Sequence, residues 1–169
     1  FYGQCSPGDL PFKSGERLDY DGYYNLKKIW VPAGKVRFEV GDSTVNGRNY
    51  FHLDGKGKSL KSYDSFFKVR DHYSSVVDEK SLQPISFLRD IHEGGYDLYY
   101  NYQFNNAKKE ATVISSKTDP SKVKVFEFPA CTFDVISAVY YARTLNFDNL
   151  EVGDTIPLQL MMDREVYSN

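Results

Sequence analysis

Residues Pro129–Ile156, PACTFDVISAVYYARTLNFDNLEVGDTI, hold the segment around which the rest of the chain is organised. From Phe133 onward apolar side chains recur at helical spacing. The pattern predicts a helix over Phe133–Thr144, about three turns long. Pro129 disfavours helical backbone at the residue before it, so we expect the preceding strand to stop at Phe128.

We expect Thr132 or Cys131 to cap the helix, with Asp134 in the first turn, where a carboxylate complements the helix dipole. The apolar face is wide, and we expect Ile136 and Val139 to be core residues. Because one helix cannot form a core alone, it should cover one face or one open end of a sheet.

The composition favours strands for the remainder of the chain. The 169 residues include 14 tyrosines and 12 phenylalanines, which are typical of strands. The formal net charge of −2 argues against electrostatic binding of nucleic acid. The sequence contains no run of about eighteen apolar residues, so it predicts no transmembrane helix. Without a repeat or a linker, residues 1–169 are predicted to form a single β-rich domain.

Alternation of apolar and polar residues predicts strands, most clearly over Lys35–Val40 and Tyr96–Phe104. Asn46-Gly47 indicates a tight hairpin turn. The glycine-containing stretch Gly55–Ser65 is predicted to be a loop or a short helical turn. Since the strands follow one another through short turns, the expected fold is mostly β. We predict a curved antiparallel sheet, or an incomplete β-barrel, with one packed α-helix.

One hairpin register has a consequence for function. Pairing Tyr73 with Phe87 brings residues of opposite charge together on both faces of the hairpin. In that register Asp71 lies opposite Arg89 on the apolar face, as an ion pair partly removed from water. We therefore predict an Asp71–Arg89 ion pair.

The chain resembles a family of exported bacterial proteins described as domain of unknown function 3108. The resemblance rests on LPFKSGERLDY (Leu10–Tyr20), WVPAGK (Trp30–Lys35), FFKVRDHYSSVVD (Phe66–Asp78), FLRDIHEGGY (Phe87–Tyr96) and Asp134–Ile156. It implies export to the periplasm or the cell surface, and it implies no activity. Members of the family continue beyond the point that matches Asn169, so the resemblance also implies that C-terminal strands of the relatives are missing here.

Two further features bear on export. The chain begins at Phe1 without an initiator methionine, as a processed or trimmed chain would. Its two cysteines, Cys5 and Cys131, fit either a disulfide bond in an exported protein or an unpaired couple. Gln4 directly before Cys5 argues against lipid attachment at that cysteine.

The sequence carries no motif of a known catalytic or cofactor site. The histidines His52, His72 and His92 do not have the spacing of a tight metal site, so we expect surface histidines, no metal and no cofactor. Gly55-Lys56-Gly57-Lys58 lacks the context of a phosphate-binding loop and is interpreted as a solvated turn.

Three polar residues share the apolar side of their strands: Asp71, Arg89 and Glu93. With Tyr100 and Tyr102 of the tyrosine-rich strand, they are the candidate ligand-binding residues. Either they fix the strand register, or Arg89 anchors an anionic head group against a surface of aromatic residues.

We expect a non-enzymatic exported module that binds an apolar or amphipathic ligand, such as a lipid-like small molecule, or an envelope protein. The alternatives are an envelope hydrolase using an acidic pair such as Asp71 and Glu93, and a purely structural envelope component.

Overall fold

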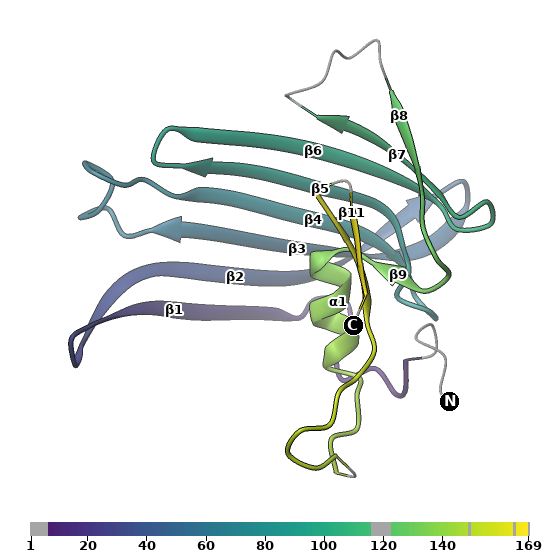
Figure 1. Ribbon diagram of the computed structural model, residues 1–169, viewed down its shortest axis with the longest axis horizontal. Coiled ribbons are helices and arrows are strands. Elements are labelled where there is room, and N and C mark those ends of the chain that lie inside the picture. The colour runs from purple at the N-terminus through teal and green to yellow at the C-terminus, as the bar shows by residue number, and fades with distance from the viewer. Residues whose placement is uncertain (1–6, 116–122, 149, 164, 169) are drawn as a thin grey trace.

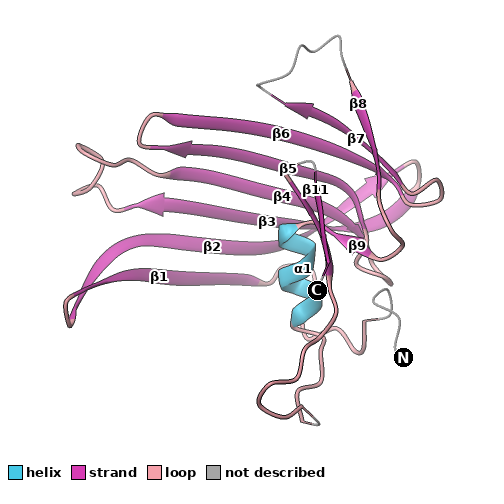
Figure 2. Cartoon of the chain, viewed as in Figure 1, coloured by secondary structure: helices cyan, strands magenta, loops and turns pink. Residues whose placement is uncertain are grey.

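The computed structural model describes residues 7–115, 123–148, 150–163 and 165–168. Strands dominate it, and they form two sheets (Figures 1 and 2). The strands of the large sheet are β1 (Arg17–Leu26), β2 (Ile29–Val45), β3 (Arg48–Ser59), β4 (Arg70–Asp78), β5 (Pro84–Glu93), β6 (Tyr96–Asn105), β7 (Glu110–Ser115) and β8 (Lys124–Glu127). The small sheet contains β9 (Thr132–Phe133), β10 (Gln159–Met162) and β11 (Glu165–Ser168), and the helix α1 spans Val135–Ala142.

The large sheet is an antiparallel meander in which each strand pairs with the next one along the chain. β1 and β8 form its two edges, so the sheet is open. α1 and the small sheet lie against one of its faces (Figure 1). This arrangement confirms the prediction of an antiparallel sheet, not closed into a barrel, with one packed helix. No helix among the described residues is long and apolar enough to cross a membrane.

Turn chemistry explains where the strands reverse. Asn46 and Gly47 have positive φ angles of 51° and 76° between the paired residues Val45 and Arg48, as a two-residue hairpin requires. The predicted hairpin is confirmed. The predicted loop at Gly55–Ser65 is wrong over its first residues, because β3 continues to Ser59.

α1 begins later than predicted, because Asp134 is itself the N-cap. Its Oδ1 accepts hydrogen bonds from the N–H groups of Ile136 (2.8 Å) and Ser137 (3.0 Å), and the Ser137 hydroxyl accepts from the N–H of Asp134. The predicted cap at Thr132 or Cys131 is wrong, since Thr132 is already part of the β9 strand.

A buried contact holds this helix end on the sheet. Asp134 is fully buried, and its Oδ2 accepts a hydrogen bond of 2.6 Å from the hydroxyl of Ser75 on β4. Burial raises the pKa of Asp134 to about 6, although hydrogen bonds from Ser75, Ser137 and Ile136 favour the charged form.

The first turn of α1 packs against β3. Ile136 is buried, and a Cβ atom at Gly55 would lie 2.9 Å from the Ile136 Cδ1 atom. Gly55 therefore lets the helix approach the sheet, which is why a glycine stands inside a strand. The prediction that Val139 is a core residue is wrong, because Val139 is 44% exposed, on the side of α1 away from the sheet.

The C-terminal end of α1 is fixed to the start of the chain. Arg143 forms a two-fold ion pair with Glu16, at 2.5 and 2.9 Å, and its guanidinium lies over the rings of Phe12 and Tyr140. Phe12 and Tyr140 are themselves buried, with ring centroids 4.9 Å apart. The lead-in to β1 thus belongs to the core under the helix.

The predicted pairing of Tyr73 with Phe87 is wrong by two residues. Tyr73 lies opposite Arg89, and the register shifts by one further residue between Val76 and Val77. The predicted Asp71–Arg89 ion pair is therefore absent from the described residues. Arg89 instead pairs with Asp163, between β10 and β11. A shift by two residues keeps every side chain on its face, so the apolar pattern alone could not exclude it.

We call the face that receives α1 the inner face. Its buried residues include Leu53, Val77, Phe87 and Tyr102, each at most 1% exposed. They form one core cluster with Ile136 of α1 and Met161 of β10, and these two elements lie at one end of the sheet (Figure 1). The other end of the inner face, near the β1–β2 turn and the β3–β4 loop, is not covered by the described residues and forms the candidate site.

Candidate binding site

A pocket of about 680 Å³ occupies the uncovered end of the inner face. Its walls come from the ends of β1 and β2, from β3, and from the loop that leads into β4. Apolar and aromatic side chains line most of it, among them Tyr24, Val31, Val36, Phe67 and Val69. The volume is within the range of pockets that hold small organic molecules.

The pocket exists because glycines take side-chain positions on three neighbouring strands. Gly22 pairs with Gly34, and Gly57 pairs with both Val36 and Asp71; all five residues line the pocket. Strand alternation puts the three glycines on the inner face, where the covered end of the sheet carries large side chains.

These glycine positions differ in whether a larger residue would fit. A Cβ atom at Gly34 would lie 2.6 Å from the carbonyl oxygen of Lys58, so glycine is required where β2 approaches β3. A Cβ atom at Gly57 would meet only the Cβ of Asp71, at 3.8 Å, which is an ordinary contact. A larger residue at Gly57 would therefore extend into the pocket without forcing the strands apart.

The β3–β4 loop supplies an aromatic wall. Tyr63 and Phe66 pack edge to face, with ring centroids 5.4 Å apart, and Phe67 rests on the Gly94 turn between β5 and β6. Asp64 holds the loop in place, because it accepts hydrogen bonds from the hydroxyl of Ser59 (2.7 Å) and from Arg70 (2.6 Å). The ring of Phe66 remains 71% exposed.

Two candidate residues from the sequence, Asp71 and Glu93, lie beside each other, and Asp71 is at the pocket. Asp71 lines the pocket, and its carboxylate accepts a hydrogen bond of 3.2 Å from the N–H of His92. Burial is the main cause that raises the pKa of Asp71, and the neighbouring charge of Glu93 adds to it. Asp71 can therefore offer a pocket ligand either an acceptor or, when protonated, a donor.

The other candidate residues lie outside the pocket. Tyr100 and Tyr102 are 4% and 0% exposed in the core, under the small sheet and helix. Arg89 lies opposite Tyr73 and Tyr100 and is held by Asp163, and no described residue accepts a hydrogen bond from its buried Nε atom. The structure thus brings Asp71 and Glu93 together, and it separates them from Arg89 and the two tyrosines.

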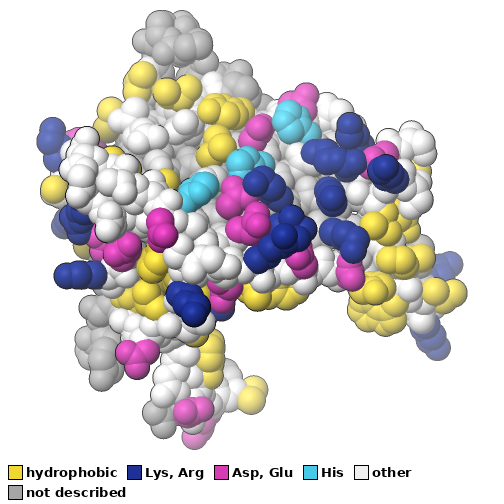
Figure 3. Space-filling model, turned by 180° about the vertical axis from the view of Figure 1, so that it is seen from behind, with side chains coloured by type: hydrophobic (Ala, Val, Ile, Leu, Met, Phe, Trp, Pro, Cys, Tyr) yellow, Lys and Arg dark blue, Asp and Glu magenta, His cyan; other side chains and the backbone are white. Residues whose placement is uncertain are grey.

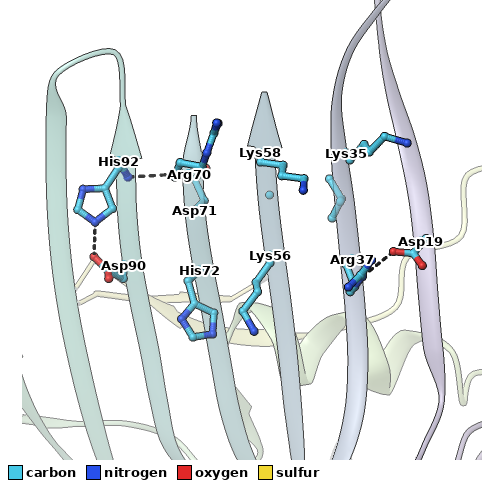
Figure 4. A pocket seen from close by; sticks show the side chains of 12 residues that line it. Asp19, Lys35, Arg37, Lys56, Lys58, Arg70, Asp71, His72, Asp90 and His92 are labelled. Atoms are coloured by element: carbon cyan, nitrogen blue, oxygen red, sulfur yellow. Dashed lines mark hydrogen bonds and ion pairs between the residues drawn. The ribbon is translucent and has the colours of Figure 1, made fainter. Parts of the chain in front are cut away.

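The opposite, outer face of the sheet is highly charged (Figure 3). A pocket of about 390 Å³ lies among its charged side chains (Figure 4). Basic side chains face one another across the strands in two rows: Lys35, Lys58 and Arg70, and Arg37, Lys56 and His72.

Carboxylates on the same face pair with most of these basic side chains. Asp21 pairs with Lys35 (2.8 Å), Asp19 with Arg37 (2.6 Å), and Asp54 with both Lys56 (2.6 Å) and His72 (2.5 Å). The pairs on β1 and β2 are exposed to water and contribute little to stability. The charged rows therefore form a balanced ion-pair network on a solvated face.

The three histidines lie on this outer face and bind different partners. The ring of His52 contacts Ser74 (2.7 Å), and that of His92 contacts Asp90 (3.1 Å) and Asp97 (2.6 Å). The hydrogen bond with Asp97 is the main cause that raises the pKa of His92. In the part of the chain that the structure describes, no three histidine, cysteine or acidic side chains converge as metal ligands would.

Comparison with known proteins identifies the family of this chain. A family model described as protein of unknown function DUF3108 matches residues 19–169. The chain belongs to the DUF3108 family. The match includes every residue that lines the apolar pocket, so the pocket lies within the DUF3108 region. No curated protein and no solved structure matches the chain.

The glycines that form the pocket of this DUF3108 protein were not recognised by the sequence analysis. Gly57 was assigned to a solvated turn, and Gly34 was assigned only to the motif WVPAGK. A usable signal was present, because Gly22, Gly34 and Gly57 all fall on the apolar phase of their strands. Glycines at such positions mark close backbone approaches or missing side chains.

Proposed function

We propose that this protein is an exported, non-enzymatic module that binds the hydrocarbon part of an amphipathic molecule in the apolar pocket. The observation that carries the proposal is a pocket of about 680 Å³ with glycines on its floor and apolar side chains on its walls. Hydrocarbon placed there would shield apolar surface from water, at about 25 cal/mol per Å².

The exposed apolar side chains on the pocket walls support the proposal that the pocket binds an apolar ligand. Tyr24 is 63% exposed, Phe67 is 51% exposed and Val36 is 36% exposed, all beside the same hollow. Contiguous exposed apolar surface of this kind marks binding sites in soluble domains. Asp71 at the inner end supplies a polar group that can orient a ligand.

Export to the periplasm or cell surface is part of the proposal. Cys131 is in a disulfide bond, and disulfide bonds persist in oxidising compartments. The other cysteine of the sequence, Cys5, lies outside the described residues. Cell fractionation of the native host would test this part, since an intracellular protein with a reduced Cys131 would contradict it.

Fluorescence titration with 11-(dansylamino)undecanoic acid tests the binding function. We expect saturable binding to the wild-type protein, a blue shift of the dansyl emission, and displacement by palmitic acid. Gly57→Leu should weaken binding at least about tenfold, because its side chain would take the place of several ligand CH₂ groups worth about 0.8 kcal/mol each.

Gly41→Leu is the matched control. Gly41 is also a strand glycine whose added Cβ would make only ordinary contacts, at 3.9 Å, but it does not line the pocket. We expect Gly41→Leu to bind the probe as the wild type does. Failure of the wild type to bind, or equal binding by a folded Gly57→Leu protein, would refute the proposal.

The contact between Asp71 and Glu93 favours a second candidate, an envelope hydrolase with an acidic pair. In that case the bound amphipathic molecule would be cleaved by water. Incubation with phospholipid vesicles should then release free fatty acid, and Asp71→Asn should stop the release without abolishing probe binding. Intact lipid after incubation would remove this candidate.

A further inference from the structure

The β1–β2 hairpin is apolar on both faces at its tip. Tyr24 pairs with Val31 on the pocket side, whereas Trp30 projects to the other side together with its pairing partner Asn25. Trp30 is 65% exposed and Ile29 is 69% exposed. A hairpin at a sheet edge ordinarily keeps one face polar, so solvent alone does not explain this pattern.

The turn of the same hairpin is strained and cationic. Its two central residues are Lys27 and Lys28, with φ angles of 48° and 94°. The next hairpin places Asn46 and Gly47 at the equivalent positions. Asparagine and glycine adopt positive φ readily, whereas two consecutive lysines do so at a conformational cost. Strain retained at such a position points to a function for the lysines.

Neither lysine is neutralised within the described part of the chain. The lysines that form ion pairs there are Lys35 and Lys56, while Lys27 and Lys28 are both exposed. Phe66, in the β3–β4 loop, lies at the same end of the sheet (Figure 1). Figure 3 shows hydrophobic side chains gathered at one end of the molecule, with Lys and Arg at its extremity.

We propose that this end of the sheet docks on an anionic phospholipid surface. We define the docking rim as Lys27, Lys28, Ile29, Trp30 and Phe66. Tryptophan and other aromatic rings partition to the level of the lipid head groups. Lysines beside them are attracted to anionic head groups within a Debye length. The overall charge of −2 makes attraction of the whole protein unfavourable, so binding depends on this rim.

The rim differs from the pocket in what it would bind, although the two are neighbours and share Phe66. The pocket would hold one hydrocarbon chain on the inner face, whereas the rim would contact many head groups at the end of the strands. Docking at this end would bring the mouth of the pocket close to the membrane. The inference goes beyond the proposed ligand binding and does not require it.

Sedimentation with vesicles tests the rim. The protein is mixed with vesicles of phosphatidylcholine alone, or of phosphatidylcholine and phosphatidylglycerol at 7:3, in low and high salt. We expect binding to the anionic vesicles, weakened by salt, and little binding to the neutral ones. The emission of Trp30, the only tryptophan of the chain, should shift to the blue on binding.

The charge contribution is tested by Lys27→Asn/Lys28→Gly, which installs the turn residues of the next hairpin. This double variant should fold at least as stably as the wild type, because it relieves the positive φ of two lysines. Its partition onto anionic vesicles should fall by about 30-fold, the factor expected for two lysines at such a surface.

The matched control is Lys108→Asn/Lys109→Gly, in the β6–β7 turn at the other end of the sheet. It removes the same charge and also relieves a positive φ, since φ of Lys109 is 57°. It should bind anionic vesicles about as strongly as the wild type does. The apolar contribution is tested by Trp30→Ser, which should weaken binding at both salt concentrations.

The two proposals fail in distinguishable ways. Gly57→Leu should still bind vesicles, and Lys27→Asn/Lys28→Gly should still bind the dansyl probe. Docking is overturned if the wild type does not sediment with anionic vesicles, or if both lysine double variants lose binding equally. It is also overturned if light scattering shows that the wild type is a dimer which Trp30→Ser dissociates, because the rim then binds a second copy.

Discussion

Asp134 links a single carboxyl group to the stability of the whole packing arrangement. The folded protein holds the Asp134 proton up to about pH 6, whereas the unfolded chain releases it near 3.8. Between these values the folded state binds more protons, so this group's contribution to stability decreases as pH rises. The decrease is on the order of 3 kcal/mol across the window.

Chemical denaturation of the wild type and Asp134→Asn between pH 4 and pH 7 measures this effect. Asparagine keeps the N-cap but cannot titrate. The difference in free energy of unfolding between the two proteins should therefore change with pH as Asp134 titrates. The wild type should lose stability relative to Asp134→Asn as pH rises from about 4 to about 6. A difference that is constant across the window, or that runs the other way, would show that the folded-state pKa is not raised.

Arg89 and Asp163 are predicted to respond unequally to mutation. Arg89 has 17% of its side chain exposed and Asp163 has 42%. Asp163→Asn would leave a poorly hydrated guanidinium without its carboxylate and should cost about 1–3 kcal/mol. Arg89→Met should cost less, because Asp163 can be solvated by water. Urea midpoints of the two variants check the order, and a more damaging Arg89→Met would contradict it.

At the scale of elements, α1 is held by the side that faces Gly55. Ile136→Ala should cost about 2–5 kcal/mol, because it leaves a cavity over β3. Val139→Ala, on the exposed side of the same helix, should change stability by less than about 0.5 kcal/mol. Denaturation midpoints of the pair provide the test. Equal effects would mean that the helix does not pack on the sheet by this side.

The elements show how far the sequence could predict the fold. Strand alternation and the Asn46-Gly47 turn were sufficient for an open antiparallel sheet with one helix. The predicted β4–β5 register was wrong because a shift of two residues preserves the apolar pattern. Gly55 and Gly57 were assigned to a loop because isolated glycines weaken a strand pattern.

The candidate site was less predictable than the fold, for a physical reason. Asp71 and Glu93 were found because polar residues on an apolar phase are unusual. The pocket beside them is defined by missing side chains and by the separation of the covered and uncovered ends of the sheet. Both depend on where α1 and the small sheet pack, and that packing joins segments far apart in the chain.

At the scale of the whole molecule, the two faces and the two ends of one sheet have different properties. The inner face is core at one end and pocket at the other, and the outer face carries balanced ion pairs. The docking rim lies beside the open end of the pocket. In our proposals an amphipathic ligand in the pocket and an anionic surface at the rim therefore meet at the same end of the protein.

Native mass spectrometry of the protein purified from its own host tests the central claim, ligand binding in the apolar pocket, most directly. Wild-type protein and Gly41→Leu should carry the same bound molecule, of mass typical for a single-chain amphipath. Gly57→Leu, folded but with its pocket filled, should be recovered without it. A wild-type spectrum free of any bound molecule, or an equal load on Gly57→Leu, would contradict the claim.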